Sequence, residues 1–204
     1  MKFNWFTKKS KNYPAFWESY LSHFIDNSNK SNNRFVVFDC ETTGLDYKSD
    51  RILSIGAIAI QNDQIVVSDF MEVFLYQDIF KPESVPIHGI LKEGDEEKIT
   101  EYEAINYFLN YIKDATLVGH HIGFDIEMIN LALHRLDAGK LKNQIMDTNV
   151  MYQKLKYLPV EQHASLDELC DIFNIKKSDR HTASGDAFIT ALLFLKLKKK
   201  LNLK

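Results

Sequence analysis

The sequence has only two cysteines among its 204 residues, Cys40 and Cys170, and neither belongs to a CxxC pair. Their scarcity and wide separation exclude a disulfide framework and a zinc site built on paired cysteines, and they favour a reduced, cytoplasmic location. The chain also lacks an apolar run long enough to span a bilayer, and polar residues interrupt its N-terminal segment where a signal peptide would be continuously apolar. We therefore expect no membrane partner.

The chain has no excess of basic residues either, because 25 lysines and arginines face 28 aspartates and glutamates for a formal net charge of −3. This balance excludes a uniformly positive surface, so binding of a polyanion would need a local basic patch or bound cations. No linker or internal repeat divides the sequence, and its 45% hydrophobic residues suffice for one sizeable core. The prediction is one main domain, residues 35–204, preceded by an N-terminal appendage, residues 1–34.

The appendage contains one segment with helical spacing of apolar residues, which begins after Pro14 and predicts a short amphipathic helix. Such a helix could pack on the main domain or dock a partner, and packing on the domain is the favoured interpretation. Its apolar residues are Phe16, Trp17, Tyr20, Leu21, Phe24 and Ile25.

The main domain opens with three strand-like runs, at residues 35–40, 52–60 and 64–75, joined by short turns that favour antiparallel neighbours. Helices and strands then alternate along the chain. The later elements are expected as a helix after the capping-box residue Thr100, a strand near 115–120, a helix near 126–136, a strand near 144–146, a helix opened by Ser165 and a final helix from about 183. This order predicts an α/β fold with a mixed five-stranded sheet flanked by helices.

Asp39 and Glu41 follow directly after the apolar run 35–38. Alternate residues of a strand point to the same face, so we expect the two carboxylates to project together. Close carboxylates repel each other unless one takes up a proton or a cation lies between them, and hard divalent cations prefer such oxygen ligands. Taken alone, such a pair is more often two solvated acids in a turn than a metal site.

Two later segments carry acids where helices begin. Asp125 lies where a strand gives way to a helix, which is also the usual place of an N-cap residue. Asp186 lies in the first turn of the last helix, where the helix dipole stabilises a carboxylate, and His181 precedes it. Gly185 is costly inside a helix, which indicates close packing at that point.

The segments FDCETTGLD, HHIGFD and HTASGDA, in this order, resemble the three motifs of the DEDD superfamily of 3′–5′ exonucleases, in its histidine-containing branch. That branch includes the proofreading epsilon subunit of bacterial DNA polymerase III, and the resemblance spans roughly residues 35–197. It implies a ribonuclease H-like fold and makes His181 the general base. The carboxylates implied to bind two divalent ions, Mg²⁺ or Mn²⁺, are Asp39, Glu41, Asp125 and Asp186.

The resemblance also implies which residues border the terminal nucleotide. The turn after Glu41 matches the segment that embraces this nucleotide, and residues 87–90 border the same pocket. His121 is a departure, because asparagine is common near its place, and a histidine there could contact phosphate, bind metal or rival His181 as the base. Asp147 is expected as an N-cap or as a residue that supports the site residues from behind. The residues implied to contact substrate are Thr42, Thr43, Gly44, Leu45, His88, His121 and Phe124.

The activity that the resemblance implies is release of nucleoside 5′-monophosphates from a single-stranded 3′ end. DNA is favoured, because the first motif is closer to the proofreading group. Two alternatives stay open: an RNA-trimming exoribonuclease, and a subunit that docks to a polymerase or another replication or repair partner through residues 14–25. The sequence ends soon after Asp186, so we expect no long C-terminal tether of the kind that the epsilon subunit uses.

Overall fold

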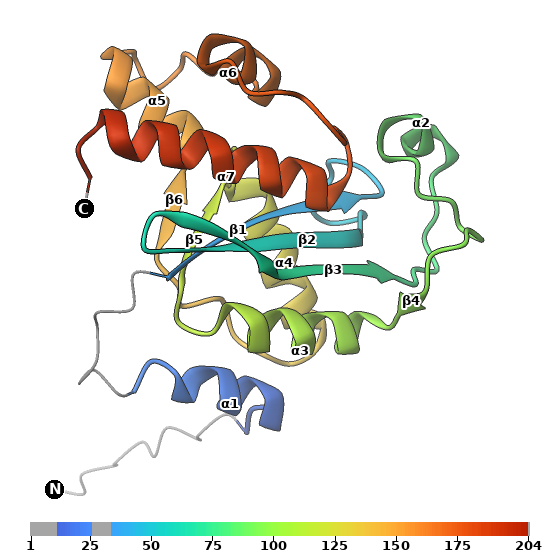
Figure 1. Ribbon diagram of the computed structural model, residues 1–204. Helices are drawn as coiled ribbons and strands as arrows, with labels where there is room; N and C mark the ends of the chain where they lie inside the picture. Colours follow the sequence, from blue (N-terminus) through green and yellow to red (C-terminus); the bar gives the residue numbers. More distant parts are fainter. Residues whose placement is uncertain (1–11, 26–33, 204) are drawn as a thin grey trace, which may run out of the picture.

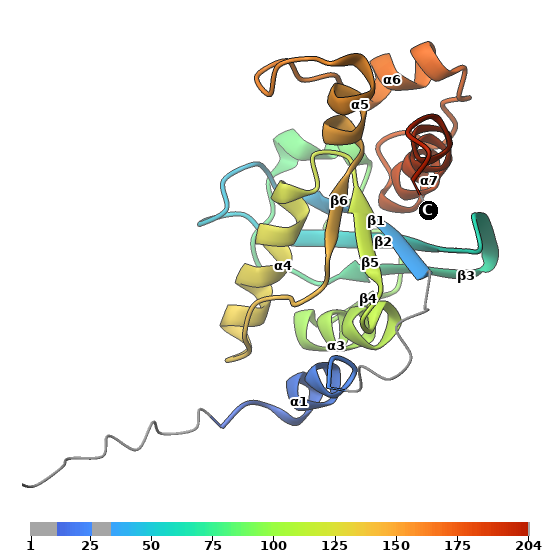
Figure 2. The same cartoon turned by 90° about the vertical axis from the view of Figure 1, so that its left-hand side faces the viewer.

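The computed structural model describes residues 12–25 and 34–203, which form one mixed sheet with helices on both faces (Figures 1 and 2). The sheet order is β4-β3-β2-β1-β5-β6. The three early strands are antiparallel neighbours, as expected, whereas β5 and β6 continue the sheet from β1 in parallel. The strands are β1 (Arg34–Thr42), β2 (Ile52–Gln61), β3 (Gln64–Leu75), β4 (Lys98–Ile99), β5 (Thr116–Gly119) and β6 (Ile145–Asp147).

The α/β prediction is confirmed, but the expected number of five strands is wrong, because the described residues form six. The additional strand, β4, has two residues and pairs in parallel with Phe74 and Leu75 at the edge of the sheet. A two-residue segment is too short to show the alternation by which strands are identified in a sequence. Its pairing is visible only in the tertiary structure.

Helices cover both faces of the sheet, with α3 and α4 on one face and α5, α6 and α7 on the other (Figure 2). The helices are α1 (Ala15–Ser22), α2 (Val85–His88), α3 (Glu101–Ile112), α4 (Gly123–Arg135), α5 (Thr148–Lys156), α6 (Leu166–Phe173) and α7 (Ala183–Lys200), with a 3₁₀ turn at Pro82–Ser84. Among the described residues, no helix has both the length and the apolar character to cross a membrane.

Local sequence signals set most helix starts. Both capping boxes are present, at Thr100 for α3 and Ser165 for α6, and Asp147 caps α5 by accepting two backbone N–H groups. The α4 helix begins earlier than expected, at Gly123 with Ile122 as its N-cap. Asp125 therefore lies inside the first turn of α4, and its interpretation as an N-cap is wrong.

The predicted amphipathic helix near the N-terminus is α1, which lies against α3 (Figure 1). Trp17 and Tyr20 are almost fully buried in the same core cluster as α3 and α4. The Tyr20 hydroxyl donates a hydrogen bond to Asn143 Oδ1 at 2.6 Å and accepts one from the backbone N–H of Lys142 at 2.7 Å. Burial raises the pKa of Tyr20 to about 12. The division into an appendage and a domain stays a prediction.

Candidate active site

The end of β1 carries the first acidic pair on the face of the sheet that α7 covers. Along β1, Val36 and Phe38 enter the core beneath α3 and α4, whereas Val37 enters the core beneath α7. Asp39 and Glu41 continue the alternation of Val37 and therefore face α7, as the strand period requires. Cys40, which lies between them in the sequence, is buried in the opposite core.

A glycine on β2 allows α7 to approach this acidic pair. Gly56 lies opposite Asp39 in the β1–β2 register, and a Cβ built on Gly56 would come within 2.2 Å of backbone atoms of Ala183 and Ser184. The first turn of α7 thus rests directly on the sheet at Gly56. This contact brings Asp186, in the same turn, to the end of β1.

Substitution of Gly56 by alanine should therefore push the start of α7 away from the sheet. We expect a loss of about 1–3 kcal/mol in unfolding free energy from overpacking, and about 10²-fold lower activity because Asp186 is displaced. Thermal unfolding and steady-state kinetics measure the two effects. Gly123→Ala is the matched control, because a Cβ there meets nothing within 4 Å; equal losses in both variants would contradict the packing argument.

Three carboxylates form the centre of the site. One oxygen each from Asp39, Glu41 and Asp186 lie within 4.8 Å of one another. Burial, and then repulsion from the neighbouring acids, hold the pKa of Asp39 well above its usual range. Burial and the charge of Asp186 likewise raise the pKa of Glu41 to about 7. Asp39 and Glu41 therefore resist losing their protons together, which is the condition that a bound cation relieves.

The fourth predicted carboxylate, Asp125, adjoins this group without being part of it. Its side chain is buried, and its Oδ1 accepts a hydrogen bond from the backbone N–H of Cys40 at 3.1 Å. Burial raises the pKa of Asp125 to about 7, the hydrogen bond opposes this shift, and the charge of Glu41 adds to it. The structure thus brings three of the four acids within mutual ligand distance and places the fourth beside β1.

His181 lies in the turn that precedes α7, and its side chain is exposed. Its backbone has a φ of 63°, in the left-handed region that few non-glycine residues occupy. The backbone N–H of His181 donates to Asp186 Oδ2 at 3.3 Å. The turn is close-packed, because a Cβ on Gly185 would lie 1.9 Å from the carbonyl oxygen of Asp179, which agrees with the expectation for Gly185.

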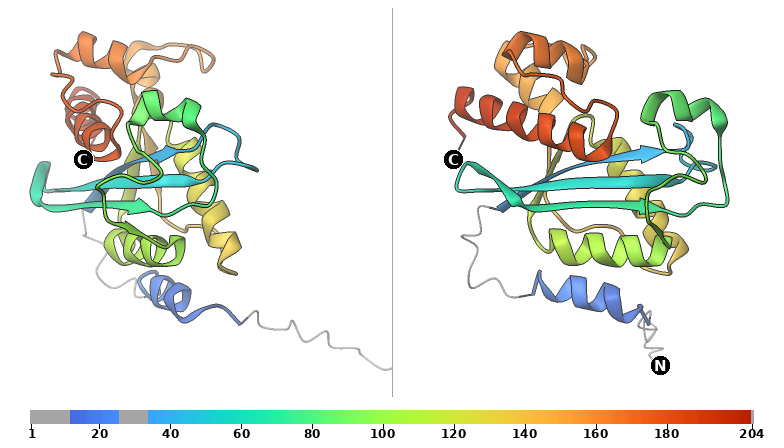
Figure 3. Two further views of the ribbon diagram at one scale, coloured as in Figure 1. Left: turned by 90° about the vertical axis from the view of Figure 1, so that its right-hand side faces the viewer. Right: turned by 45° about the vertical axis from the view of Figure 1, so that its right-hand side comes forward.

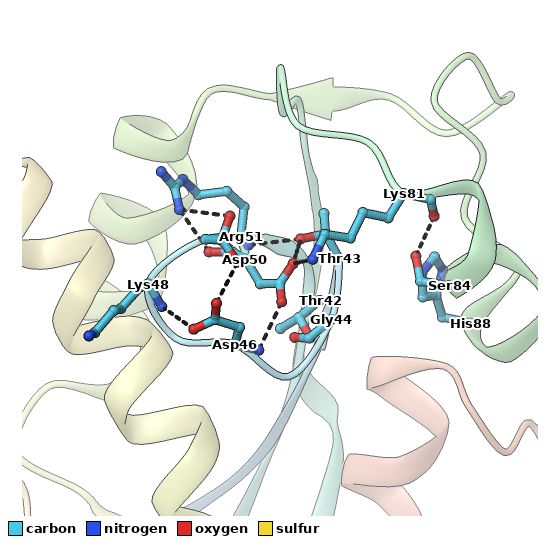
Figure 4. A network of polar contacts seen from close by, with 11 residues as sticks. Thr42, Thr43, Gly44, Asp46, Lys48, Asp50, Arg51, Lys81, Ser84 and His88 are labelled. Carbon is cyan, nitrogen blue, oxygen red and sulfur yellow. Dashed lines mark hydrogen bonds and ion pairs between the residues drawn. The ribbon is translucent and has the colours of Figure 1, made fainter.

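The loop after β1 is held from inside by Asp50, which is only 1% exposed (Figure 4). The Thr43 hydroxyl donates to Asp50 Oδ1 at 2.6 Å, the backbone N–H of Asp46 donates to Asp50 Oδ2 at 2.8 Å, and Lys81 forms an ion pair with Asp50 at 2.6 Å. The Thr43 side chain is thus directed into the loop. Leu45, in contrast, is 81% exposed at its tip.

The segment before β4, which includes α2, lines a pocket beside the site. In α2, His88 is buried, its Nδ1 accepts the backbone N–H of Ile90 at 3.0 Å, and its Nε2 lies 3.0 Å from Ser84 Oγ. A neutral ring with Nε2–H donating to the hydroxyl satisfies both contacts, and burial lowers the pKa of His88.

A pocket of about 560 Å³ separates α2 from the start of α7, and both helices lie on the same side of the sheet (Figure 3). Ser54 lines this pocket and pairs with Glu41 across the β1–β2 register, so the pocket lies next to the strand position that carries Glu41. Its other sides include His88, Ile90 and Phe188.

The second motif forms a tight turn between β5 and α4. His121 has a φ of 54°, and asparagine and histidine are among the residues that best tolerate this conformation, which explains why His121 can occupy a place where asparagine is common. The turn is fixed by the backbone N–H of Ile122, which donates to Asp147 Oδ2 at 3.1 Å. Phe124 extends toward the loop after β1, where its ring lies 5.3 Å from that of Tyr47.

This arrangement of acids, loop and pocket agrees with the comparison with known protein families. A family model described as exonuclease matches residues 36–194 of the chain. The chain belongs to the exonuclease family. The resemblance expected from the three motifs is thereby confirmed.

The relatives of this chain include bacterial DNA polymerase III proteins. The DNA polymerase III PolC-type protein of Caldanaerobacter subterraneus subsp. tengcongensis is 34% identical over 178 residues, which cover 82% of this chain and 12% of that protein. The DNA polymerase III subunit epsilon of Escherichia coli strain K12 is 33% identical over 172 residues, 79% of this chain and 70% of that protein. The chain thus spans only a small part of the PolC-type relatives.

The fold has relatives among solved structures. The crystal structure of E. coli exonuclease I in complex with a dT13 oligonucleotide has a TM-score of 0.71 and 18% identity, and it covers 83% of this chain and 42% of that chain. This likeness supports the expected ribonuclease H-like α/β fold.

Three residues of the exonuclease site have no counterpart among the sequence-based predictions. Arg180 forms an ion pair with Asp186, Asp167 holds the guanidinium of Arg180, and Asp50 organises the loop after β1. Asp167 lies in the first turn of α6, where acidic residues are common, so its position in the sequence did not indicate a role in the site. The available signal for Arg180 was its position directly before His181, as a cation next to an acidic motif.

Proposed function

We propose that this exonuclease removes nucleoside 5′-monophosphates from the 3′ end of single-stranded DNA with the help of two divalent ions, Mg²⁺ or Mn²⁺. The observation that carries the proposal is the cluster of Asp39, Glu41 and Asp186, whose oxygens lie within 4.8 Å of one another. An all-oxygen, acidic donor set, in which the pKa values of Asp39 and Glu41 are raised, fits hard divalent cations and needs their charge before it can accept a phosphate.

The proposal assigns a role to each of the acidic residues and to His181. Asp39, Glu41 and Asp186 would hold the ions, with Asp125 completing the set from α4. When bound, such ions activate a water and neutralise the departing 3′ oxygen. His181 accepts the proton of the attacking water, since its imidazole is exposed while its backbone is tied to Asp186.

The loop and the pocket would receive the strand end. Leu45, exposed at the loop tip, and the ring pair of Tyr47 and Phe124 offer apolar surface to a base, because every base has a face on which an aromatic side chain can stack. The Thr42–Gly44 turn and His88 would border the terminal nucleotide, and His121, in the turn after β5, would contact a phosphate of the strand. Hydrogen bonds of Thr42 and Thr43 within the loop after β1 hold this turn in place.

DNA is the favoured substrate, since the relatives include DNA polymerase III proteins and a structural neighbour carries a DNA oligonucleotide. The same relatives support a cytoplasmic protein that works beside a polymerase or another replication or repair protein.

Matched single-stranded DNA and RNA oligonucleotides with a 5′ label test the proposal. With Mn²⁺ or Mg²⁺ we expect stepwise shortening from the 3′ end and mononucleotide products, and EDTA should stop the reaction. A 3′-phosphorylated strand is the matched control, because it blocks the terminal hydroxyl. Faster loss of the RNA would reassign the substrate, and intact strands of both kinds with either ion would contradict the activity.

A further inference from the structure

Arg180 joins carboxylates from two different helices. Its Nε and Nη2 donate to Oδ1 and Oδ2 of Asp167, at 3.0 and 3.3 Å, which is the two-pronged geometry that guanidinium and carboxylate groups favour. Its third nitrogen, Nη1, forms an ion pair with Asp186 Oδ1 that lacks hydrogen-bond geometry. The Arg180 side chain is 17% exposed. The guanidinium is thus held between the first turns of α6 and α7.

This guanidinium brings a permanent positive charge to the acidic centre, because arginine is not deprotonated in proteins. The charge of Arg180 opposes the rise in the pKa of both Asp39 and Glu41. The neighbouring cation Lys177 pairs with Asp167 and Asp171, and none of its ion pairs reaches Asp186. Among the ion pairs of the described residues, Arg180 is the one cation that contacts the three-carboxylate cluster.

Both oxygens of Asp186 have partners. Oδ1 is paired with Arg180, and Oδ2 accepts the backbone N–H of His181 at 3.3 Å. A divalent ion on Asp186 would lie next to the guanidinium, and two cations that share one carboxylate in a partly buried site repel each other. Asp167 lies outside the cluster and binds Arg180 through two other nitrogens, so Asp167 and Asp186 compete for the same guanidinium.

We propose that Arg180 is a positioning residue that neutralises Asp186 in the metal-free exonuclease and competes with a divalent ion for it, while Asp167 restrains Arg180 so that the ion can bind. The inference rests on the proposed function only in requiring that Asp186 binds a divalent ion. The inference predicts that removal of Arg180 strengthens the binding of a divalent ion, whereas removal of the charge of Asp167 weakens it. If the ion pair were merely structural, both substitutions would change the affinity in the same direction.

The test measures Mn²⁺ binding to the full-length, metal-free protein by isothermal titration calorimetry, without nucleic acid. Arg180→Gln removes the competing charge, so the Kd for Mn²⁺ should fall by about threefold or more. Asp167→Asn leaves the charge but frees it to move onto Asp186, so the Kd should rise by about threefold or more. Lys177→Gln, which removes the neighbouring cation of Asp167, should leave the Kd unchanged.

Thermal unfolding supplies a second measurement. In EDTA, Arg180→Gln should lower the Tm because the acids then repel without a counter-charge, and added Mn²⁺ should raise its Tm by more than that of the wild type. Shifts of the Kd in the same direction for Arg180→Gln and Asp167→Asn, or no shift in either, would overturn the inference. Tight Mn²⁺ binding by a wild type that degrades no strand would instead contradict the proposed function and leave the inference intact.

Discussion

Asp39→Asn should lower the rate of strand shortening by about 10³-fold or more, because loss of this proposed metal ligand would remove several kcal/mol of transition-state stabilisation. Asparagine has nearly the shape of aspartate, so the end of β1 keeps its packing. The measurement is kcat on a single-stranded DNA oligonucleotide with saturating Mn²⁺. Retention of more than about a tenth of the wild-type rate would remove Asp39 from the metal site.

The same substitution should stabilise the metal-free protein at neutral pH. The pKa of Asp39 is raised in the fold, and those of Glu41 and Asp125 are raised to about 7, so the folded state binds more protons than the unfolded state. The contribution of these groups to the unfolding free energy of the metal-free wild type is therefore fully present below about pH 4. It is lost as the pH rises through 7.

Asp39→Asn removes one of the groups that hold a proton in the folded state, so the unfolding free energy should fall less steeply as the pH rises. At pH 7.5 in EDTA the variant's Tm should exceed that of the wild type, by about 2–4 °C for each kcal/mol of repulsion relieved. A simultaneous loss of activity and gain in Tm excludes misfolding as the cause of inactivity. A lower Tm at pH 7.5 would show that Asp39 is not held in a repulsive environment.

His181→Ala should reduce kcat by about 10²–10⁴-fold, the usual contribution of a positioned general base. The side chain of His181 is exposed and its link to Asp186 runs through the backbone N–H, which alanine retains. Mn²⁺ binding should therefore survive the substitution. Single-turnover cleavage and Mn²⁺ titration separate the two properties.

The matched control is His134→Ala, since His134 is an exposed histidine in the last turn of α4. It should cleave DNA at the wild-type rate. If His181→Ala were as active as this control, the base would have to be another group, and His121, at the end of β5, is the next histidine to test.

Several local features were predictable because each depends on a few neighbouring residues. Thr100 and Ser165 start helices through hydrogen bonds within one turn, and Asp147 caps α5 in the same way. The apolar run before Asp39 determines a central strand, and the strand period alone puts Asp39 and Glu41 on one face. Such signals need no knowledge of the rest of the fold.

Other features depend on contacts between segments that are distant in the sequence. The two-residue strand β4 exists only through its pairing with β3. Helix α4 begins at Gly123, earlier than predicted, directly after a turn in which the backbone N–H of Ile122 donates to Asp147 at the end of β6. The buried role of Asp50 appears only when Thr43 and Lys81 are brought to it.

The sequence by itself determined which residue types the site contains: the acids, the histidine and the small turn that the three motifs share with the exonuclease family. Only the tertiary structure decided how they meet. Helix α7 rests on Gly56, where no side chain keeps it from the sheet, and this close approach carries Asp186 to Asp39 and Glu41. It also brings Arg180 between Asp167 and Asp186, because helix packing, rather than any local pattern, sets the distance between α6 and α7.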